Sequence, residues 1–276
     1  MITVAVVARD EENFIGRCLR SILRNRPDEV IVVAHKCVDR TIRVAAKFGI
    51  KTAQCERSYG EAFNVALGAA GSKYVFFVDA DSVLPDNFLR KLKKTTLPIL
   101  SRDDKVAGVG CFLHPYNDDC LLKHLEWLIY DYSQRKKCSK HIGSLAGGTV
   151  WNRDLLLKVG GFRPLDGGPE PELCNRLTES GYSLVLLPSL TLYHEFVHKM
   201  DWRVLFGGFH VPQNVENIYF LLRLFSAPIS AAMLTVDTWK KDRSISSFML
   251  LAYYPFKRFV AAFSSFAGYF WGLVVG

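Results

Sequence analysis

The sequence predicts an α/β protein in which a mostly parallel sheet carries helices on both faces. Three observations support this prediction. Up to about Leu192, short β-rich apolar runs alternate with segments of helical periodicity. Two of the helical segments end at Gly49 and Gly71, and glycine is the residue that commonly closes a helix. Charged residues follow the apolar runs directly, as they do at the carboxyl edge of a doubly wound sheet.

The elements can be assigned in order along the first eighty residues. Four strands are predicted, at Ile2–Ala8, Glu29–Ala34, Lys51–Cys55 and Tyr74–Val78. Three helices are predicted between them, at Glu11–Leu23, Thr41–Phe48 and Glu61–Ala70. The first helix carries one apolar stripe, made of Phe14, Ile15, Cys18, Leu19, Ile22 and Leu23. This alternation predicts parallel strands joined by right-handed crossovers.

Polar, mostly charged side chains follow each of the four predicted strands. In chain order they are Arg9, Asp10 and Glu11, then His35, Lys36 and Asp39, then Glu56 and Arg57, then Asp79 and Asp81. Ligands of open α/β sheets bind at this edge, so the set predicts a mixed-charge nucleotide pocket. The first strand is not followed by GxGxxG, and GxxxxGK[ST] is absent from the chain, which disfavours a dinucleotide oxidoreductase and a P-loop NTPase.

The fourth strand ends in two carboxylates, Asp79 and Asp81, spaced two residues apart. Two hard oxygen donors at the end of a buried strand suit Mg²⁺ or Mn²⁺ that bridges a diphosphate. The alternative interpretation is an Asp-rich turn that caps the helix following Pro85 and Asp86.

Composition narrows the choice of partners and compartment. The net charge of +8 indicates anionic partners, such as nucleotides or an acidic membrane face. Nucleic acid is disfavoured because the basic residues are spread along helices without aromatic stacking motifs. Seven scattered cysteines without a CxxC pair disfavour a disulfide framework or a zinc site and favour a reducing compartment. No signal peptide precedes the first strand, so the amino terminus is expected to face the cytoplasm.

The composition changes after Met200, where aromatic and aliphatic residues dominate. Phe259–Val275 contains no charge and follows Lys257 and Arg258, which is typical of a membrane span with a cytoplasmic basic flank. A second apolar stretch, Ile218–Val236, is interrupted by a charge and a proline and favours an interfacial or re-entrant element. The alternative is that both stretches are buried helices of a soluble protein.

The chain is therefore predicted to have two parts. Residues 1–200 form the α/β catalytic domain, and residues 201–276 form amphipathic interfacial helices and a membrane anchor. Leu121–Tyr132 is a further candidate amphipathic helix, expected to lie under the functional site. This organisation predicts a membrane protein whose catalytic domain faces the cytoplasm.

Six short motifs occur in an order and at a spacing that resemble one family. Val7–Ile15 resembles a Pro-x-Tyr-Asn-Glu segment, and Gly60–Asn64 resembles the start of a Gly-x-x-x-Ala/Asn helix. Asp79–Asp81 resembles a metal-binding DxD motif. A Gly-Gly block, a Glu-rich helix start and a Tyr-His-Glu sequence follow, at Ala146–Phe162, Pro169–Tyr182 and Tyr193–Glu195. Over residues 2 to 196 the chain thus resembles glycosyltransferase family 2, inverting enzymes of the GT-A fold.

The resemblance implies a reaction and a role for each matching residue. The reaction is transfer of a sugar from a nucleoside-diphosphate sugar, with inversion, and it depends on Mn²⁺ or Mg²⁺. The metal ligands are Asp79, Asp81 and His194, and the catalytic base is Glu170. The donor-binding residues are Ala8, Arg9, Glu11, His35, Asp39, Arg57, Asn64, Asp79, Ala80 and Asp81. The acceptor side holds Gly147, Gly148, Thr149 and Arg176.

The sequence departs from the family pattern at four places. Arg9 replaces the tyrosine of the first motif. The second strand lacks the carboxylate that holds the nucleobase, since the stretch Ala34–Asp39 keeps only its last acid, so GDP-linked and UDP-linked donors both stay open. Glu170 stands where the family has an aspartate base. Gln213 is not followed by the Q-x-x-R-W pattern, which puts polymerising activity in doubt.

Three functions are weighed from these residues. A carboxylate base favours a hydroxyl acceptor, because a lipid phosphate is already anionic, so the leading hypothesis is hexosyl transfer, possibly of mannose or glucose, to a lipid-linked glycan at the membrane. The second hypothesis is a polyprenyl (dolichyl) phosphate sugar synthase. The third is a non-catalytic membrane adaptor that binds a nucleotide sugar, motivated by the altered second strand.

Overall fold

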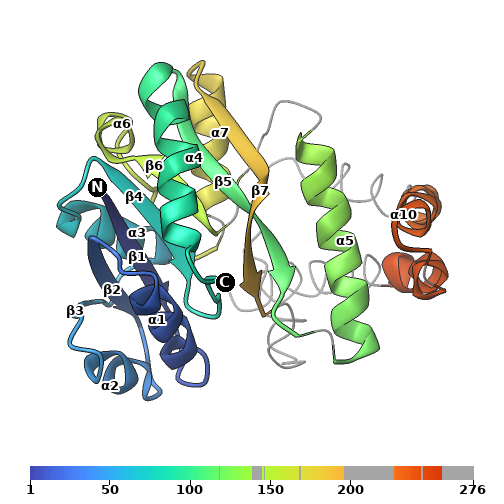
Figure 1. The fold of residues 1–276 in the computed structure, drawn as a ribbon, viewed down its shortest axis with the longest axis horizontal. Coiled ribbons are helices and arrows are strands. Elements are labelled where there is room, and N and C mark those ends of the chain that lie inside the picture. Colours follow the sequence, from blue (N-terminus) through green and yellow to red (C-terminus); the bar gives the residue numbers. More distant parts are fainter. Residues whose placement is uncertain are drawn as a thin grey trace, which may run out of the picture. The chain divides into compact units, whose positions relative to one another are not determined.

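The computed structural model describes residues 1–117, 119–138, 145, 147–167, 169–195, 227–243 and 245–256. The chain divides into two compact units (Figure 1). The first unit contains Met1–Tyr116 and Gln134–Glu195, and the second contains Asn117–Ser133 and Phe196–Gly276. The predicted boundary at residue 200 was drawn from composition alone, and it left residues 117–133 with the first unit.

A seven-stranded mixed sheet forms the centre of the first unit, in the order β3-β2-β1-β4-β6-β5-β7. The four predicted strands are β1 (Ile2–Ala8), β2 (Glu29–His35), β3 (Lys51–Cys55) and β4 (Tyr74–Asp79), and they pair in parallel. Three strands follow, β5 (Val106–Pro115), β6 (Thr149–Asn152) and β7 (Ser183–His194). β6 runs antiparallel to β4 and β5, whereas β7 is parallel to β5. The predicted α/β fold is confirmed, with a mixed sheet.

Helices connect the strands of the first unit and cover the sheet. They are α1 (Ile15–Arg24), α2 (Thr41–Ala46), α3 (Tyr59–Ala69), α4 (Phe88–Arg102), α6 (Arg153–Lys158) and α7 (Pro169–Glu179). β1 is buried along its whole length, and Ala5 and Val7 pack in a core shared with α3, α6 and α7. Val4 and Val6 are equally buried and face the opposite side, because side chains alternate along a strand. Both faces of the sheet are therefore covered, as parallel strands require.

Two helices begin at positions that differ from the prediction. α1 begins at Ile15 rather than Glu11, because Glu11 donates its backbone N–H to Thr41 Oγ1 and starts a turn. α3 begins at Tyr59 rather than Glu61, because Ser58 is its N-cap. The Ser58 side chain accepts from the Glu61 N–H, and the Glu61 side chain accepts from the Ser58 N–H. This capping box satisfies two backbone donors that the helix start would otherwise leave unpaired.

The described part of the second unit is helical. It consists of the first two-thirds of α5 (Leu121–Cys138), α10 (Ala227–Asp242) and a helix at residues 246–256. Leu125, Leu128, Leu234 and Leu250 form its core. Among the described residues, no helix combines the length and the apolar character needed to cross a membrane. The predicted span at Phe259–Val275 and residues 218–226 of the second apolar stretch lie outside the described residues.

Candidate active site

The candidate metal ligands are brought together by the ends of β4 and β7. Asp79 is the last residue of β4, and His194 is the last residue of β7. Val83 and Tyr193 pair as an isolated antiparallel bridge, with N–H donors 2.8 and 3.0 Å from the facing carbonyls. This bridge ties the turn that carries Asp81 to the strand end that carries His194, so residues more than a hundred positions apart share one site.

Asp79, Asp81 and His194 form a group whose ligand atoms all lie within 4.8 Å of one another. The Nε2 atom of His194 is 3.3 Å from Asp81 Oδ1 and 3.6 Å from Asp79 Oδ2. Asp81 is buried, and the other two side chains are partly exposed. Carboxylate oxygens and an imidazole nitrogen are donors that Mn²⁺ accepts, and the carboxylates alone suit Mg²⁺. The residues predicted to hold a divalent cation therefore fit one.

Gly147 lies against the Asp79 carboxylate, and Gly148 lies against Leu192. A Cβ atom built on Gly147 would lie 1.8 Å from Asp79 Oδ2, so this position admits only glycine while Asp79 keeps its place. Gly148 has a φ of +80° and donates its N–H to the Phe77 carbonyl, 3.0 Å away. Thr149 is buried and begins β6. The family resemblance assigned these residues to the acceptor side, and the structure shows that the two glycines also shape the metal end of β4.

Glu170 is the second residue of α7 and is half-buried. Burial, and to a smaller extent the negative charge of Asp79, raise the pKa of its carboxyl group to about 8. The contribution of Asp79 to this pKa indicates that Glu170 lies within electrostatic range of that carboxylate. A carboxylate with a pKa close to neutral is well suited to accept a proton from a sugar hydroxyl.

The segment that leads into α7 is fastened to the start of α3. The Asn64 amide donates from Nδ2 to the Phe162 carbonyl and accepts the Phe162 N–H at Oδ1, both at 2.8 Å. Asp166 accepts from the Tyr59 N–H at 3.1 Å, and Lys36 Nζ lies 3.4 Å from the same Asp166 oxygen. Asn64 was assigned to the donor by resemblance. The structure uses both polar atoms of its side chain to position the segment before Glu170.

Arg176 has a similar structural role. Its guanidinium donates to the carbonyls of Val159 and Gly161 and pairs with Glu172 at 3.0 Å. Those carbonyls lie in the turn Val159–Phe162, and the segment that leads into α7 follows this turn. Arg176 therefore supports the predicted acceptor side indirectly, because it holds the backbone of this turn in place.

Most of the predicted donor-binding residues lie in the loops after β1 to β4. Arg9 and Arg57 are exposed, and Arg57 also pairs with Glu61 at 3.1 Å. The Asp39 carboxylate accepts from the Glu12 and Thr41 N–H groups, at 2.9 and 2.8 Å. Ala8 and Ala80 are buried, so they can meet a ligand only through their backbone. These contacts fix the loop backbones and leave the two arginines as accessible cations.

The structure corrects the predicted position of His35 at the carboxyl edge of the sheet. The sequence analysis placed it with the charged residues after β2, but β2 continues through it and its side chain is fully buried. Its ring packs 5.3 Å from the Tyr59 ring, and Nε2 lies 3.0 Å from the Arg57 carbonyl. His35 falls on the same face as Val33, because side chains alternate along a strand, and that face is covered by α3.

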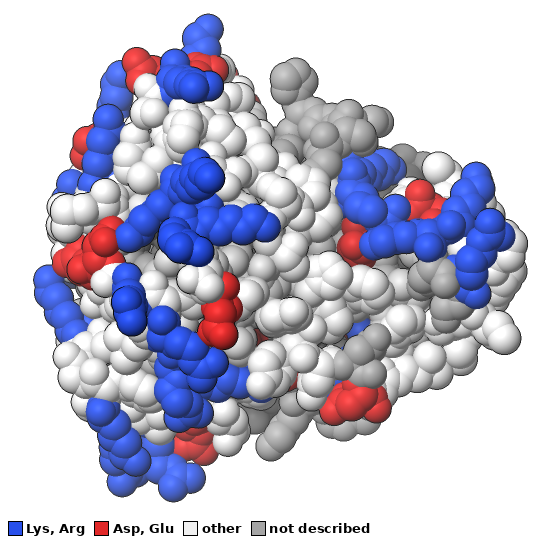
Figure 2. All heavy atoms as spheres, viewed as in Figure 1, with Lys and Arg blue, Asp and Glu red and all other residues white. Residues whose placement is uncertain are grey.

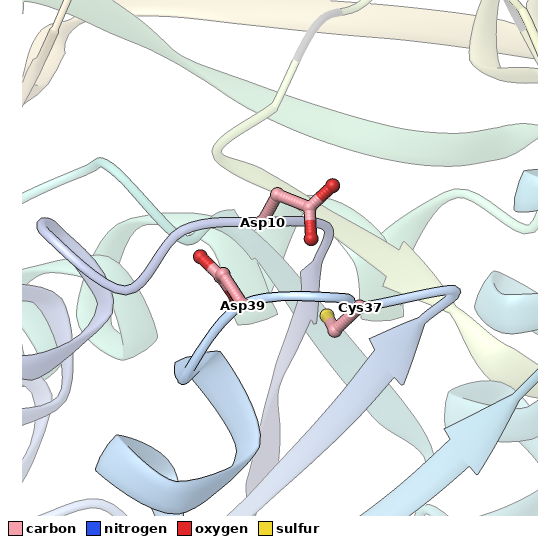
Figure 3. Close-up of side chains that lie close together, drawn as sticks. All are labelled: Asp10, Cys37 and Asp39. Carbon is pink, nitrogen blue, oxygen red and sulfur yellow. The ribbon is translucent and has the colours of Figure 1, made fainter.

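A second group of ligating side chains lies after β1 and β2 (Figure 3). Asp10, Cys37 and Asp39 come within 4.8 Å of one another. Asp10 accepts from the Val38 N–H at 2.8 Å, and the Cys37 thiol lies 3.3 Å from the Ala8 carbonyl. With Asp39 also bonded to backbone, the group joins the loops that follow β1 and β2.

One set of contacts around His194 was not anticipated from the sequence. Tyr116 donates its N–H to the His194 carbonyl at 2.9 Å. The Arg17 guanidinium lies 3.8 Å from the centre of the Tyr116 ring, and Arg17 Nη2 lies 3.4 Å from Glu195 Oε2. Arg17 therefore contacts Tyr116 and Glu195, the two residues on either side of the metal ligand His194. The only signal in the sequence is Glu195 in the Tyr-His-Glu motif, since its partner is 178 residues away.

Comparison with known proteins agrees with this geometry. A family model described as "Glycosyltransferase like family 2" matches residues 1–206. A search of curated proteins finds no match. Among solved structures, the mannosyltransferase PcManGT from Pyrobaculum calidifontis, in complex with GDP-Man and Mn²⁺, is 18% identical with a TM-score of 0.54. The alignment covers 100% of this chain and 75% of PcManGT.

Two further solved structures are similar. Residues 1–349 of TarS from S. aureus are 15% identical, with a TM-score of 0.52 and coverage of 91% of this chain and 69% of that TarS fragment. Glucosyl-3-phosphoglycerate synthase from Mycobacterium tuberculosis, in complex with Mn²⁺, UDP-Glc and phosphoglyceric acid, is 22% identical. Its TM-score is 0.51, with coverage of 75% of this chain and 74% of the synthase. At these identities the likeness shows the fold, and it confirms the predicted GT-A architecture.

Proposed function

The chain belongs to glycosyltransferase-like family 2 and is a glycosyltransferase that uses a nucleotide sugar, and from that premise we propose its reaction in detail. It transfers a hexose, with inversion, from a GDP- or UDP-linked donor to a hydroxyl group of a lipid-linked glycan. The observation that carries the proposal is the group of Asp79, Asp81 and His194 beside Glu170, whose pKa responds to the charge of Asp79.

The residues divide the chemistry between leaving group and acceptor. Asp79, Asp81 and His194 hold Mn²⁺ or Mg²⁺, and the bound cation supplies the positive charge that stabilises a departing diphosphate. Glu170 accepts the proton of the acceptor hydroxyl as that oxygen forms its bond to the anomeric carbon. The bond from that carbon to the diphosphate oxygen breaks on the opposite side, which inverts the configuration.

The donor is assigned by charge and by analogy. Arg9 and Arg57 are exposed cations at the carboxyl edge of the sheet, where they can pair with phosphate oxygens. The similar structures are complexes with GDP-Man, UDP-Glc or UDP-GlcNAc. Mannose and glucose are therefore the first sugars to test, with both nucleotides.

The acceptor is proposed to be membrane-bound. Glu170 has the properties of a general base, which a hydroxyl acceptor needs and an anionic lipid phosphate does not. A lipid-linked acceptor lies at the headgroup level, so an enzyme held at the cytoplasmic face of that membrane meets it at high effective concentration. Transfer to polyprenyl phosphate alone is the competing outcome, and offering the two acceptors separately distinguishes them.

The proposed reaction can be tested with matched variants of the two carboxylates. Donor binding is measured as the Mn²⁺-dependent rise in melting temperature with GDP, UDP and their sugars, and transfer is measured with radiolabelled donor. Asp81→Asn should abolish both. Glu170→Gln should keep the melting shift and lower transfer by about a hundredfold or more.

The controls are acidic residues that are exposed and lie elsewhere. Asp154→Asn and Glu179→Gln, the latter in the same helix as Glu170, should leave binding and transfer unchanged. Wild-type transfer by Glu170→Gln would refute the assignment of the base. A melting shift without any transfer in the wild-type protein, with either acceptor, would indicate a binding protein instead.

A further inference from the structure

The described helices of the second unit expose apolar side chains to the outside. Every exposed residue of α10 before Lys240 is apolar, and so is every exposed residue of the helix at 246–256. These residues are Pro228, Ile229, Ala232, Met233, Val236 and Trp239 in α10, and Phe248, Met249, Leu251, Ala252 and Phe256 in the second helix. The Trp239 and Phe248 rings lie 6.1 Å apart, so the two exposed faces meet in one surface, here called the apolar face.

The interior of the same unit contains several polar side chains beside its leucine core. Asp131, Thr235, Thr238 and Ser247 are all buried. Lys241 Nζ pairs with the Asp131 carboxylate at 2.8 Å, which joins α10 to α5. The Tyr253 hydroxyl donates to the Glu126 carboxylate, which joins the last described helix to α5. Two polar contacts therefore join α5 to the two later helices, in addition to the leucine core.

An exposed apolar face together with several buried polar side chains is unusual for a protein surrounded by water. Soluble proteins bury apolar residues, and a monomer rarely exposes a continuous apolar surface of more than a few hundred Å². In a lipid environment, polar and charged side chains turn toward the helix interior and pair with one another, while apolar side chains face the acyl chains. Several large side chains of the apolar face are more than half exposed, including Ile229, Met233 and Phe256.

Cations border the apolar face at one end. Lys240 and Arg243 are exposed where α10 ends, and the Arg243 guanidinium lies 4.5 Å from the centre of the Trp239 ring. Figure 2 shows basic side chains gathered on this side of the view, with a few acidic side chains among them. Tryptophan with neighbouring arginine or lysine is typical of the membrane interface, where the ring sits at the headgroup level and the cation meets lipid phosphate.

We propose that α10 and the helix at 246–256 lie in one leaflet of a membrane, with the apolar face in the acyl chains and Lys240 and Arg243 at anionic headgroups. The exposed cations beside Trp239 favour this occupant over a second copy of the chain, since they suit anionic headgroups at the border of an apolar surface. The inference deepens the proposed function, because it names the surface that meets the membrane of the lipid-linked acceptor. It rests on the helices alone and not on the chemistry.

The test measures the environment of Trp239 in the full-length protein. The emission of Trp239 is obtained as the difference between wild type and Trp239→Phe, with the protein in vesicles whose acyl chains carry bromine. Bromine quenches indole on contact, so this difference should be lost in brominated vesicles and kept in ordinary ones. Quenching should be stronger when phosphatidylglycerol is mixed with phosphatidylcholine than with phosphatidylcholine alone.

Charged substitutions in the apolar face should reverse the docking. Met233→Glu and Phe248→Glu should each shift the equilibrium between docked and undocked helices by about tenfold, since each removes a large apolar side chain from lipid. Leu157→Glu, at an exposed leucine of the first unit, is the matched control and should not change quenching. Lys240→Glu and Arg243→Glu should remove the preference for phosphatidylglycerol, whereas Lys94→Glu should not.

Three outcomes would overturn the proposal. Trp239 emission that brominated lipid leaves unchanged would show that α10 faces water. Emission that Met233→Glu changes only together with the number of protomers, measured by light scattering, would show that a second copy covers the face. Equal quenching with Leu157→Glu and Met233→Glu would show that lipid contact is unspecific. Because no donor or acceptor is present, each of these results is independent of whether the protein transfers sugar.

Discussion

The pKa of Glu170 is raised in the folded protein, partly by the charge of Asp79. The free energy of unfolding of the metal-free protein should therefore depend on pH. Burial and Asp79 raise the pKa of Glu170 from 4.5 to about 8. The folded state then binds a proton that the unfolded state releases between these values. The resulting stabilisation is complete below pH 4.5 and is lost as the pH rises through 8.

The corresponding prediction compares wild type with Glu170→Gln in the presence of EDTA. Between pH 5 and 8 the melting temperature of the wild-type protein should fall relative to that of Glu170→Gln, which cannot titrate at this position. Glu179→Gln should follow the wild type. Parallel pH profiles for wild type and Glu170→Gln would show that Glu170 does not have a raised pKa.

Gly147 gives a prediction about the metal site. In Gly147→Ala the new Cβ would occupy the place of the Asp79 carboxylate, so Asp79 must turn away from Asp81 and His194. We expect the affinity for Mn²⁺, measured by electron paramagnetic resonance of the free ion, to fall by about ten- to a hundredfold. Gly68→Ala, where the added carbon meets open space, should bind Mn²⁺ like the wild type.

Arg17 gives a prediction about positioning. It contacts Tyr116 and Glu195, which lie on either side of the metal ligand His194. Arg17→Met should weaken Mn²⁺ binding by about tenfold, with Arg17→Lys intermediate and the exposed Arg20→Met unchanged. Lower turnover with unaltered Mn²⁺ affinity would assign Arg17 a role other than holding His194.

At the scale of the element, the start of α3 decides where the segment before Glu170 is held. The capping box of Ser58 and Glu61 fixes this helix end, and Tyr59 and Asn64 then bind Asp166 and Phe162. Ser58→Ala should lower the free energy of unfolding by about 1 kcal/mol in urea. Ser101→Ala, at an exposed position in α4, should change it little. An equal loss in both variants would mean that the cap contributes nothing of its own.

The sequence predicted β1 to β4 well, because buried parallel strands are continuous apolar runs whose length and order suffice for assignment. It misplaced His35 because the end of a strand is not visible in a run that a polar residue can extend. It did not predict the antiparallel β6, since four residues between a Gly-Gly pair and α6 carry no periodic pattern. The helix starts at Ile15 and Tyr59 depended on side-chain caps and on contacts with distant loops.

The candidate site was predicted in part for the same reason. Asp79 and Asp81 follow a strand and could be identified locally, whereas His194 was reached only through the family resemblance. The clamps made by Asn64 and Arg176 could not be predicted, because they bind backbone carbonyls and N–H groups that become neighbours only in the folded chain. Local patterns thus indicate ligands, and tertiary structure decides which polar residues are used for support.

At the scale of the whole molecule, composition alone suggested a division near residue 200. The structure groups Asn117–Ser133 with the carboxyl-terminal region, because Leu125 and Leu128 pack with Leu234 and Leu250. Helical periodicity marked this segment as amphipathic, but periodicity does not identify the partner that covers an apolar stripe.

Two of the places where the chain leaves the first unit lie side by side. One exit follows Tyr116 and the other follows Glu195, and the Tyr116 N–H bonds to the His194 carbonyl between them. A change of state in the second unit that pulls on either exit reaches the histidine ligand within one or two residues. The two equilibria are then thermodynamically linked. If a change of state in the second unit alters the affinity for Mn²⁺ by some factor, binding of Mn²⁺ must shift the equilibrium between those states by the same factor.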